Sequence, residues 1–320
     1  TSTAERDAFP NDSRTVGHIS EDKNLAAAEP RVYLLIPIHN RCQTTQRCLM
    51  RLVEAQLLSF PYTVVVIDDG SSDGSAEMIQ HSFPEVVILA GEGDLWWTGA
   101  MVMGMAYAYD HGADYIVWLN DDCLVSDAAV AGLVEMCQSH DAIAGGQGYV
   151  EAQPSTLAFG GKRQTWKGFR YQRLAIGERQ PCDLLSGNLV CLPTRVIDQV
   201  GYPDTARTPH YGGDALYLLR ARKAGYQLYV DARFPVYDSA VGESRLYPTN
   251  WLLAEGAPTH LLSLVFMPQS GLSWRVWLAT NWEAYGVWGM AMFAKKYIVI
   301  LVFTLLRYLP LSLRKAVVAR

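Results

Sequence analysis

Two pairs of adjacent carboxylates have the chemical type and the position to hold a ligand. Asp68 and Asp69 end an apolar run of β-branched residues, and Asp121 and Asp122 follow a second apolar run through Asn120. A charge at the end of a buried strand must be paired or functional, because burying an unpaired charge is costly. Such a carboxylate can accept hydrogen bonds from a nucleoside, and Mg²⁺ binds through one or two carboxylates plus substrate phosphates. Either pair alone also fits a capped loop, but the two together favour a diphosphate ligand.

A further carboxylate, Asp214, stands at the start of a predicted helix. It follows Tyr211, Gly212 and Gly213. One interpretation is that Asp214 caps the helix. The other is that it acts as a general base for an acceptor hydroxyl, which requires reach and a suitable pKa. The nearby Arg220 can hold a carboxylate or phosphate through two hydrogen bonds, or it can form a structural ion pair, and both alternatives stay open.

A turn between the two carboxylate pairs contains two adjacent tryptophans, Trp96 and Trp97. Their rings can stack on a sugar or a base. Packing in the core is an equally good interpretation for one of the two. A helix that starts after Thr98 would favour the negative charge of a diphosphate at its N-terminus.

Strands and helices alternate through the first part of the chain. We predict strands at 32–37, 62–67, 86–89 and 115–119, and helices at 41–58, 75–81, 99–111 and 126–137. Continuous apolar strands are typical of a parallel sheet covered on both faces. Repeated strand–helix units therefore predict an open α/β sheet, in which ligands bind at the carboxyl ends of the strands. Both carboxylate pairs lie at such ends.

The later part of the chain has weaker signals. We predict irregular sheet and loops at 145–180, a loop at 204–211, a helix at 214–224 and a last strand at 226–230. The 320 residues, of which 50% are hydrophobic, suffice for one large domain with an appendage. The net charge of −5 argues against a nucleic-acid partner. Six cysteines without paired spacing argue against a zinc site and indicate buried side chains in a reducing compartment.

The two ends of the chain differ in composition. Residues 1–30 are polar and lack the apolar stretch of a signal peptide, so we predict a poorly ordered arm. From Ala284 onward the chain has no Asp or Glu but several Lys and Arg. The apolar segment 285–309 is interrupted by Lys295 and Lys296, and its uninterrupted part is too short to span a membrane. We predict an interfacial helix on an anionic membrane, with a core or oligomer-interface helix as the alternative.

Four motifs together resemble those of family 2 glycosyltransferases with the GT-A fold. They are Pro37-Ile38-His39-Asn40-Arg41, Ile67-Asp68-Asp69-Gly70-Ser71-Ser72-Asp73-Gly74, Asn120-Asp121-Asp122 and Tyr211-Gly212-Gly213-Asp214. The resemblance covers residues 31 to 240. It implies an inverting transfer of a sugar from a nucleotide-sugar donor to a hydroxyl of a glycan or lipid-linked acceptor, as in surface polysaccharide synthesis. Asn120 in the first position of the family's D-x-D motif resembles the rhamnosyltransferase-like branch, and thus dTDP-rhamnose as donor.

The resemblance also implies a role for each matching residue. Asp214 is the catalytic base, and Asp122 binds a divalent metal, Mg²⁺ or Mn²⁺. Gly213 and Arg220 belong to the acceptor or phosphate side. The residues on the donor side are Pro37, His39, Asn40, Arg41, Asp68, Asp69, Asp94, Trp97, Gly99, Asn120 and Asp121.

These observations predict three parts of the chain. They are an arm at 1–30, a GT-A catalytic domain at 31–245, and a helical segment at 246–320 that associates with the membrane. The GT-A domain has a mostly parallel central sheet flanked by helices. The expected location is the cytoplasm, peripheral at the inner face of the membrane, with a homo-oligomer also possible. A catalytically inactive sugar-binding or scaffold protein is the alternative, because Asn120 removes one charge. A nucleotidyltransferase fits less well, since Pro37-Ile38-His39-Asn40 is not a Gly-rich phosphate loop.

Overall fold

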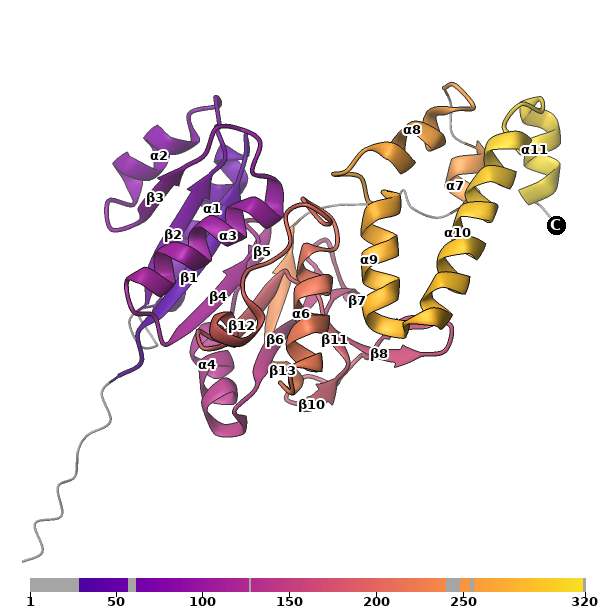
Figure 1. Ribbon diagram of the computed structural model, residues 1–320. Helices are drawn as coiled ribbons and strands as arrows, with labels where there is room; N and C mark the ends of the chain where they lie inside the picture. Colours follow the sequence, from indigo (N-terminus) through magenta and orange to yellow (C-terminus); the bar gives the residue numbers. More distant parts are fainter. Residues whose placement is uncertain (1–28, 57–61, 127, 240–247, 254–255, 319–320) are drawn as a thin grey trace, which may run out of the picture.

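The computed structural model describes residues 29–56, 62–126, 128–239, 248–253 and 256–318. Nearly all of the predicted arm, residues 1–28, lies outside this range. The described chain forms a large α/β body and a set of C-terminal helices beside it (Figure 1). All six cysteines lie in the described range, and five of them are buried free thiols, as predicted.

One sheet of ten strands organises the described part of the α/β body. In spatial order its strands are β10 (Arg179–Cys182), β13 (Leu228–Asp238), β6 (Ile143–Val150), β12 (Leu189–Pro193), β4 (Tyr115–Leu119), β1 (Val32–Ile38), β2 (Thr63–Asp68) and β3 (Val87–Ala90). The short β5 (Cys123–Leu124) pairs with β13, and β7 (Gln153–Phe159) pairs with β6. A second sheet contains β11 (Leu184–Leu185), β8 (Gly161–Thr165) and β9 (Gly168–Tyr171).

The strand directions bring the motifs to one edge of the sheet. Strands β3, β2, β1 and β4 are parallel, so their carboxyl ends meet at the same edge. Strand β12 is antiparallel to β4, and its first residue, Leu189, lies opposite Leu119. The segment that enters β12 therefore joins that edge, where the Asn120 N–H donates to the Asn188 carbonyl over 2.9 Å.

Helices cover both faces of the sheet. They are α1 (Cys42–Gln56), α2 (Ser75–Ser82), α3 (Trp96–Asp110), α4 (Ala129–His140), α5 (Val196–Val200) and α6 (Gly213–Lys223). Alternate residues of β1 enter different cores: Leu34 packs with Leu49 of α1, whereas Leu35 packs with Met101 of α3. Helix α4 shares the first core and α6 the second. The predicted two-faced coverage of the sheet is confirmed.

Several predicted elements needed correction. Helix α3 begins at Trp96, earlier than predicted. Helix α4 begins at Ala129, later than predicted, and its cap is Ala128, which adopts a positive φ, rather than Ser126. The region predicted to be irregular contains β6, a fully paired inner strand, and β12 had not been predicted as a strand. The glycines of β6 explain why this strand was predicted to be irregular. They are needed for packing, because a Cβ on Gly148 would lie 2.2 Å from the Phe159 ring.

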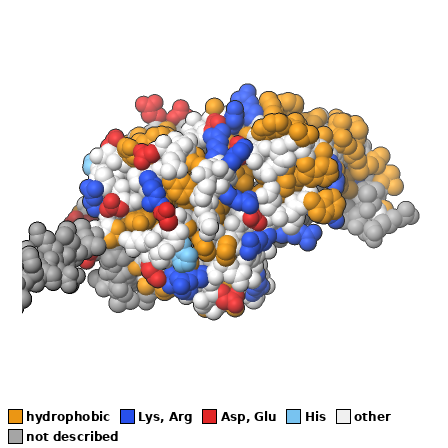
Figure 2. Space-filling view, turned by 60° about the horizontal axis from the view of Figure 1, so that its bottom comes forward, with side chains coloured by type: hydrophobic (Ala, Val, Ile, Leu, Met, Phe, Trp, Pro, Cys, Tyr) orange, Lys and Arg blue, Asp and Glu red, His pale blue; other side chains and the backbone are white. Residues whose placement is uncertain are grey.

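Five C-terminal helices follow in the described part of the chain. They are α7 (Pro248–Leu253), α8 (His260–Phe266), α9 (Trp274–Tyr285), α10 (Val287–Leu306) and α11 (Leu311–Val318). Helix α9 packs against α6, while Trp251, Leu261 and Ile300 form a small third core. Figure 2 shows that hydrophobic side chains gather at this end of the molecule, next to several Lys and Arg side chains. The predicted boundary between the catalytic domain and this segment, at residues 245 and 246, lies outside the described range.

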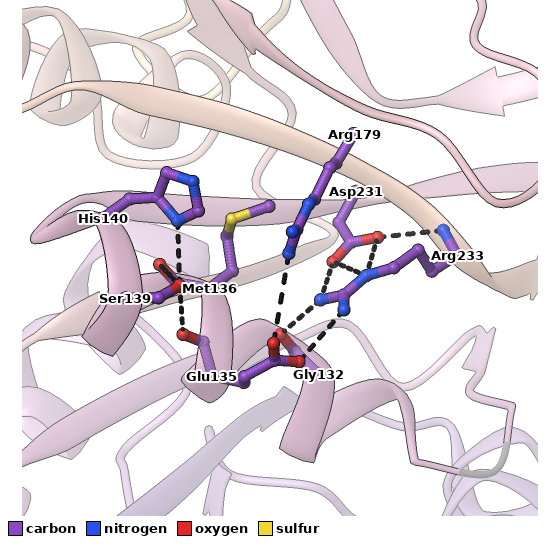
Figure 3. Close-up of polar contacts among 8 residues, drawn as sticks. All are labelled: Gly132, Glu135, Met136, Ser139, His140, Arg179, Asp231 and Arg233. Carbon is purple, nitrogen blue, oxygen red and sulfur yellow. Dashed lines mark hydrogen bonds and ion pairs between the residues drawn. The ribbon is translucent and has the colours of Figure 1, made fainter.

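A closed polar cluster ties α4 to β13 (Figure 3). The Asp231 side chain is buried, and the Arg233 guanidinium donates to both of its oxygens through Nε at 3.2 and 3.0 Å. Arg233 also donates to Glu135 Oε2 over 3.0 Å and to the Gly132 carbonyl over 3.1 Å. Arg179 Nη1 lies 4.0 Å from the other Glu135 oxygen. The charges of this cluster are therefore paired within the protein.

Candidate active site

A cavity of about 580 Å³ opens at the carboxyl edge of the parallel strands. Ten of the residues that the sequence singled out for ligand contact or catalysis line it: Pro37, His39, Arg41, Asp69, Trp96, Trp97, Asn120, Asp121, Asp122 and Asp214. They come from the end of β1 and the turn after it, the turn after β2, the start of α3, the turn after β4 and the start of α6. The sheet therefore unites both carboxylate pairs with the carboxylate of α6.

Arg41 supplies the cation that the second carboxylate pair needs. Its Nε lies 3.2 Å from Asp121 Oδ2, and its Nη2 donates to Asp122 Oδ2 over 3.0 Å. Thr45 Oγ1 donates to Asp121 over 3.1 Å. Burial raises the pKa of Asp121 to about 6, which Arg41 opposes and Asp122 reinforces. Asp122 is the more accessible of the two carboxylates and the better placed to meet a ligand.

Asn120 is held in place by Trp97. The Trp97 Nε1–H donates to Asn120 Oδ1 over 2.9 Å, and the Trp97 ring packs edge-on against buried Trp118 at 5.5 Å between centroids. The amide nitrogen of Asn120 then remains as a hydrogen-bond donor. Trp97 thus combines the two interpretations: it touches the cavity and packs on the core.

Trp96 is the tryptophan that is open to the cavity. It is 43% exposed, and its backbone φ is +54°, a value that is rare for a bulky residue. The Asp69 carboxylate holds this turn by accepting from the N–H groups of Gly93, Leu95 and Trp96 at 2.8, 3.2 and 2.9 Å. Strained backbone of this kind is found at ligand sites, where the surroundings enforce it.

Hydrogen bonds join the turns after β1 and β2 to each other beside the cavity. Asp68 is buried and accepts from the Ser71 N–H over 2.9 Å, so it lies behind the cavity lining. His39 Nδ1 donates to the Asp69 carbonyl over 2.6 Å. The exposed Asn40 accepts from the Ser72 N–H over 2.8 Å. The contact of Asp68 with a nucleoside stays a prediction.

Asp214 faces the cavity from the first turn of α6. The helix cap is Gly212, with a φ of +77°, and no side chain caps this helix. Asp214 Oδ2 instead accepts from the Gly187 N–H over 2.8 Å. A Cβ at position 187 would lie 2.5 Å from the Cβ of Asp214, so only glycine fits there. The capping interpretation is therefore wrong, and Asp214 is fixed by a loop from the other side of the cavity.

The start of α3 lies directly against the start of α6. A Cβ on Gly213 would approach Thr98 Oγ1 to 2.1 Å, so glycine permits this contact. The Thr98 N–H donates to the Pro209 carbonyl over 3.1 Å, and its hydroxyl donates to the Thr208 carbonyl. Gly99 is buried in the same turn of α3. Gly213 therefore allows the two helices to approach closely, and neither Gly213 nor Gly99 lines the cavity.

Two further predicted residues lie away from the cavity lining. Asp94 is exposed in the turn before α3. Arg220 donates to Asp204 over 3.2 Å, and its Nε is 4.0 Å from Glu283 of α9. This arrangement favours the structural ion pair for Arg220, which joins α6, α9 and the 201–211 loop.

The structure adds cavity residues that the sequence had not assigned. They are Ile38, Gly93, Ala100, Gly187, Asn188, His210, Tyr211 and Gly212. Burial lowers the pKa of His210, against the opposing charge of Asp214. Tyr211 stood in the motif that ends at Asp214, and His210 directly precedes that motif, so this proximity was a usable signal. Gly187 and Asn188 had no such signal, because β12 was not predicted.

Asp122 is the cavity residue that could hold a metal ion arriving with a phosphate ligand. In the described residues, no group of three His, Cys, Asp or Glu side chains is placed to hold a metal by itself. Mg²⁺, however, commonly uses one or two carboxylates, several waters and substrate phosphates. Asp122 at the cavity wall provides such a carboxylate, with Oδ2 shared by Arg41.

Residues 33–188 match the model of glycosyl transferase family 2. This family 2 segment runs from β1 to the loop before β12 and contains both carboxylate pairs, while Asp214 lies beyond it. The fold is similar to that of GalNAc-T7, crystallised with UDP, GalNAc and Mn²⁺, with a TM-score of 0.54 at 14% identity. That similarity covers 68% of this chain and 46% of the GalNAc-T7 chain, so this chain spans less than half of its length. The predicted GT-A fold is confirmed.

Another solved structure, S. aureus TarS 1-349, has a TM-score of 0.49 at 11% identity, over 80% of this chain and 72% of that chain. No curated protein matches the sequence significantly.

Proposed function

We propose that this protein is a glycosyltransferase whose active site is the cavity at the sheet edge. One observation carries the proposal: the Asp214 carboxylate shares a cavity with Asn120, Asp122 and Arg41, and is held there by Gly187 rather than by its own helix. The match to the family 2 segment and the GT-A fold support sugar transfer as the reaction. Because Asp214 lies outside the matched segment, its position is a separate argument for the same conclusion.

The donor side of the proposed site is the wall formed by β1, β4 and the start of α3. Arg41 can donate to diphosphate oxygens, because a guanidinium presents several N–H groups in a fixed plane. The exposed Trp96 ring can stack on a base or a sugar. A divalent ion, Mg²⁺ or Mn²⁺, bound by Asp122 and the donor phosphates would neutralise charge on the leaving diphosphate.

The base side of the site is the start of α6. In the proposed reaction, Asp214 takes the proton of an acceptor hydroxyl as its oxygen forms a bond to the anomeric carbon. The bond from that carbon to the diphosphate oxygen breaks, and the nucleoside diphosphate leaves with the electron pair. A single displacement of this kind inverts the anomeric configuration. Asp214 then acts as general base on the face opposite the leaving group.

The finer assignment follows the motif resemblance. Asn120 in place of an acidic residue favours dTDP-rhamnose as the donor, and a glycan or lipid-linked acceptor of surface polysaccharide synthesis. The proposed setting is the inner face of the cytoplasmic membrane. These specificities depend on the shape of the cavity and are the part of the proposal that a donor screen resolves.

The test is turnover of a panel of UDP-, GDP- and dTDP-sugars, with wild type compared to Asp214→Asn and Asp122→Ala. We expect wild type to release nucleoside diphosphate from at least one donor, and both variants to lose most of that rate. Asp110→Asn serves as a matched control, because Asp110 is exposed at the end of α3. Undiminished turnover in both cavity variants would refute the assignment.

A sugar-binding protein without activity is the second candidate, and Asn120 is the observation that favours it. Calorimetry with UDP, GDP and dTDP separates the two, with and without Mn²⁺. An enzyme should bind its nucleotide more tightly with Mn²⁺ and turn over the sugar donor. Binding without metal dependence, together with no turnover, would favour the inactive protein.

A further inference from the structure

Helix α10 presents a continuous apolar stripe to the outside of the molecule. Val287 is 80% exposed, Ile298 61% and Leu305 60%. Together with Ala291, Ala294 and Leu301, these residues recur every three or four positions. That spacing places them on one face of a helix. Within the described residues, α10 is the single helix long and apolar enough to cross a membrane, with a mean hydropathy of 1.8 and 17% of its window buried.

The opposite face of α10 packs against the rest of the protein. Ile300 and Thr304 are 1% and 2% exposed, and Ile300 belongs to the third core with Trp251 and Leu261. The Tyr297 hydroxyl donates to the Leu272 carbonyl over 2.8 Å. A helix that is packed on protein along one side, and that carries two lysines halfway along, is suited to lie on a bilayer rather than to cross it. The exposed stripe is therefore the face left for a partner.

The charges of the C-terminal segment indicate which partner fits the stripe. From Ala284 to the end the sequence has no acidic residue, and Lys295 and Lys315 are exposed. A second copy of the chain, related by a two-fold axis, would bring the same basic surface against itself without any carboxylate from this segment to neutralise it. An anionic lipid surface complements these charges.

Exposed tryptophans lie at the same end of the molecule. Trp282 is 54% exposed and Trp288 50%, on either side of the turn between α9 and α10. The Trp288 ring N–H donates to the Trp166 carbonyl over 2.8 Å, so the turn is fixed to the β8–β9 hairpin. Tryptophan is enriched where a protein meets the headgroup region of a membrane. Figure 2 shows the hydrophobic surface and the basic side chains at this end of the molecule.

We propose that the outer face of α10, with Lys295 and Lys315, docks on the surface of an anionic bilayer and lies in its plane. The partner is the lipid surface itself. This docking goes beyond the proposed sugar transfer and does not depend on it.

The experiment is flotation of the full chain with vesicles of phosphatidylcholine, with and without phosphatidylglycerol. We expect the chain to float with the anionic vesicles and to dissociate as salt is raised. Replacing both lysines, Lys295→Gln with Lys315→Gln, should weaken binding about 25-fold, since each basic residue near an anionic surface contributes about fivefold.

The apolar stripe is tested by Ile298→Asp and Leu305→Asp, which should abolish flotation. Ile176→Asp is the matched control, because Ile176 is 70% exposed on the α/β body. All variants should keep the melting temperature of wild type, which shows that they fold. Sedimentation velocity without lipid tests whether a second copy of the chain occupies the stripe instead. A wild-type dimer that Ile298→Asp dissociates, together with no flotation, would overturn the proposal, and so would equal flotation of Ile298→Asp and Ile176→Asp.

Discussion

Two clusters in this molecule pair an arginine with a buried aspartate, yet they differ in what surrounds them. In the closed cluster, Arg233 meets Asp231, Glu135 and a backbone carbonyl, and it joins α4 to β13. In the open cluster, Arg41 meets Asp121 and Asp122 at the cavity wall, and 39% of its side chain remains exposed. The open cluster thus keeps hydrogen-bonding capacity for a ligand, whereas the hydrogen bonds of Arg233 in the closed cluster are made to groups of the protein.

The difference shows that an ion pair takes its role from its surroundings. A buried pair contributes little net stability by itself, but the loss of one partner leaves a costly unpaired charge. That rule makes the closed cluster a structural element. At the cavity the same chemistry keeps two adjacent carboxylates together and presents Arg41 and Asp122 to a ligand. Substitutions in the two clusters should therefore move different measurements.

The largest expected effect on stability comes from Arg233→Met. It leaves the buried Asp231 carboxylate without its guanidinium, so we expect the free energy of unfolding to fall by about 3–5 kcal/mol. Urea denaturation monitored by circular dichroism measures this change. The turnover per folded molecule should stay at the wild-type value, and a variant as stable as wild type would show that the closed cluster is not structural.

Arg41→Lys should lower activity more than stability. Lysine keeps the charge but cannot reach two carboxylates and a diphosphate with one fork of N–H groups. A lost hydrogen bond to a charged group is worth about 1.5–3 kcal/mol, so kcat/KM for the sugar donor should fall roughly 10- to 150-fold.

Arg233→Lys is the matched control for this change, since it alters the same fork in the closed cluster. It should lower the melting temperature and leave kcat/KM unchanged. The comparison of the two clusters fails if the two lysine variants show the same balance of lost activity and lost stability.

Trp96→Gly should weaken donor binding at the cavity but, unlike the arginine substitutions, should not lower stability. Glycine adopts the φ of +54° without strain, so the melting temperature should rise or stay constant. Loss of a stacking ring worth about 0.5–1.5 kcal/mol should raise KM for the donor roughly 2- to 12-fold. Calorimetric titration and steady-state kinetics measure the two effects, and an unchanged KM would remove Trp96 from the donor site.

The smallest effect concerns a cation that faces an aromatic ring instead of a carboxylate. Burial lowers the pKa of Lys296 to about 8, and its ammonium lies 3.1 Å from the centroid of the Trp277 ring. The folded state therefore binds fewer protons than the unfolded state between pH 8 and the usual lysine pKa near 10.4, so this lysine makes stability rise with pH in that window. Lys296→Met should flatten this rise in thermal melts, and an unchanged slope would contradict the assignment.

The sequence predicted well which residues line the cavity wall formed by β1, β4 and the start of α3, because local signals define that wall. Apolar strands that end in Asp68 or Asn120 report the sheet edge directly, and the parallel order of β1, β2 and β4 follows from strand–helix alternation. Position 214 was found for the same reason, as a carboxylate at a helix start. The sequence could not exclude a capping role for Asp214, which the Gly212 cap and the contact of Asp214 with the Gly187 N–H do exclude.

The remaining parts depend on contacts between distant segments. Arg41 pairs with two carboxylates that lie 80 or more positions further along the chain. No local sequence pattern predicts such a contact. Strand β12 was missed although its five residues, Leu189–Pro193, are all buried. Glycines at 146 and 148 in β6 resemble a loop in sequence, while in the fold they admit the side chains of Leu189 and Phe159. Long-range packing decided these positions.

The most direct test of the account is the rate of nucleoside diphosphate release by Asp214→Asn with the donor that wild type uses. Asparagine retains the size of Asp214 and can still accept from the Gly187 N–H, but it cannot take up the acceptor proton. We predict normal binding of the nucleotide in calorimetry and a kcat lower by about 100- to 10,000-fold, the usual contribution of a general base. A variant that binds the nucleotide and transfers sugar at the wild-type rate would contradict the central claim.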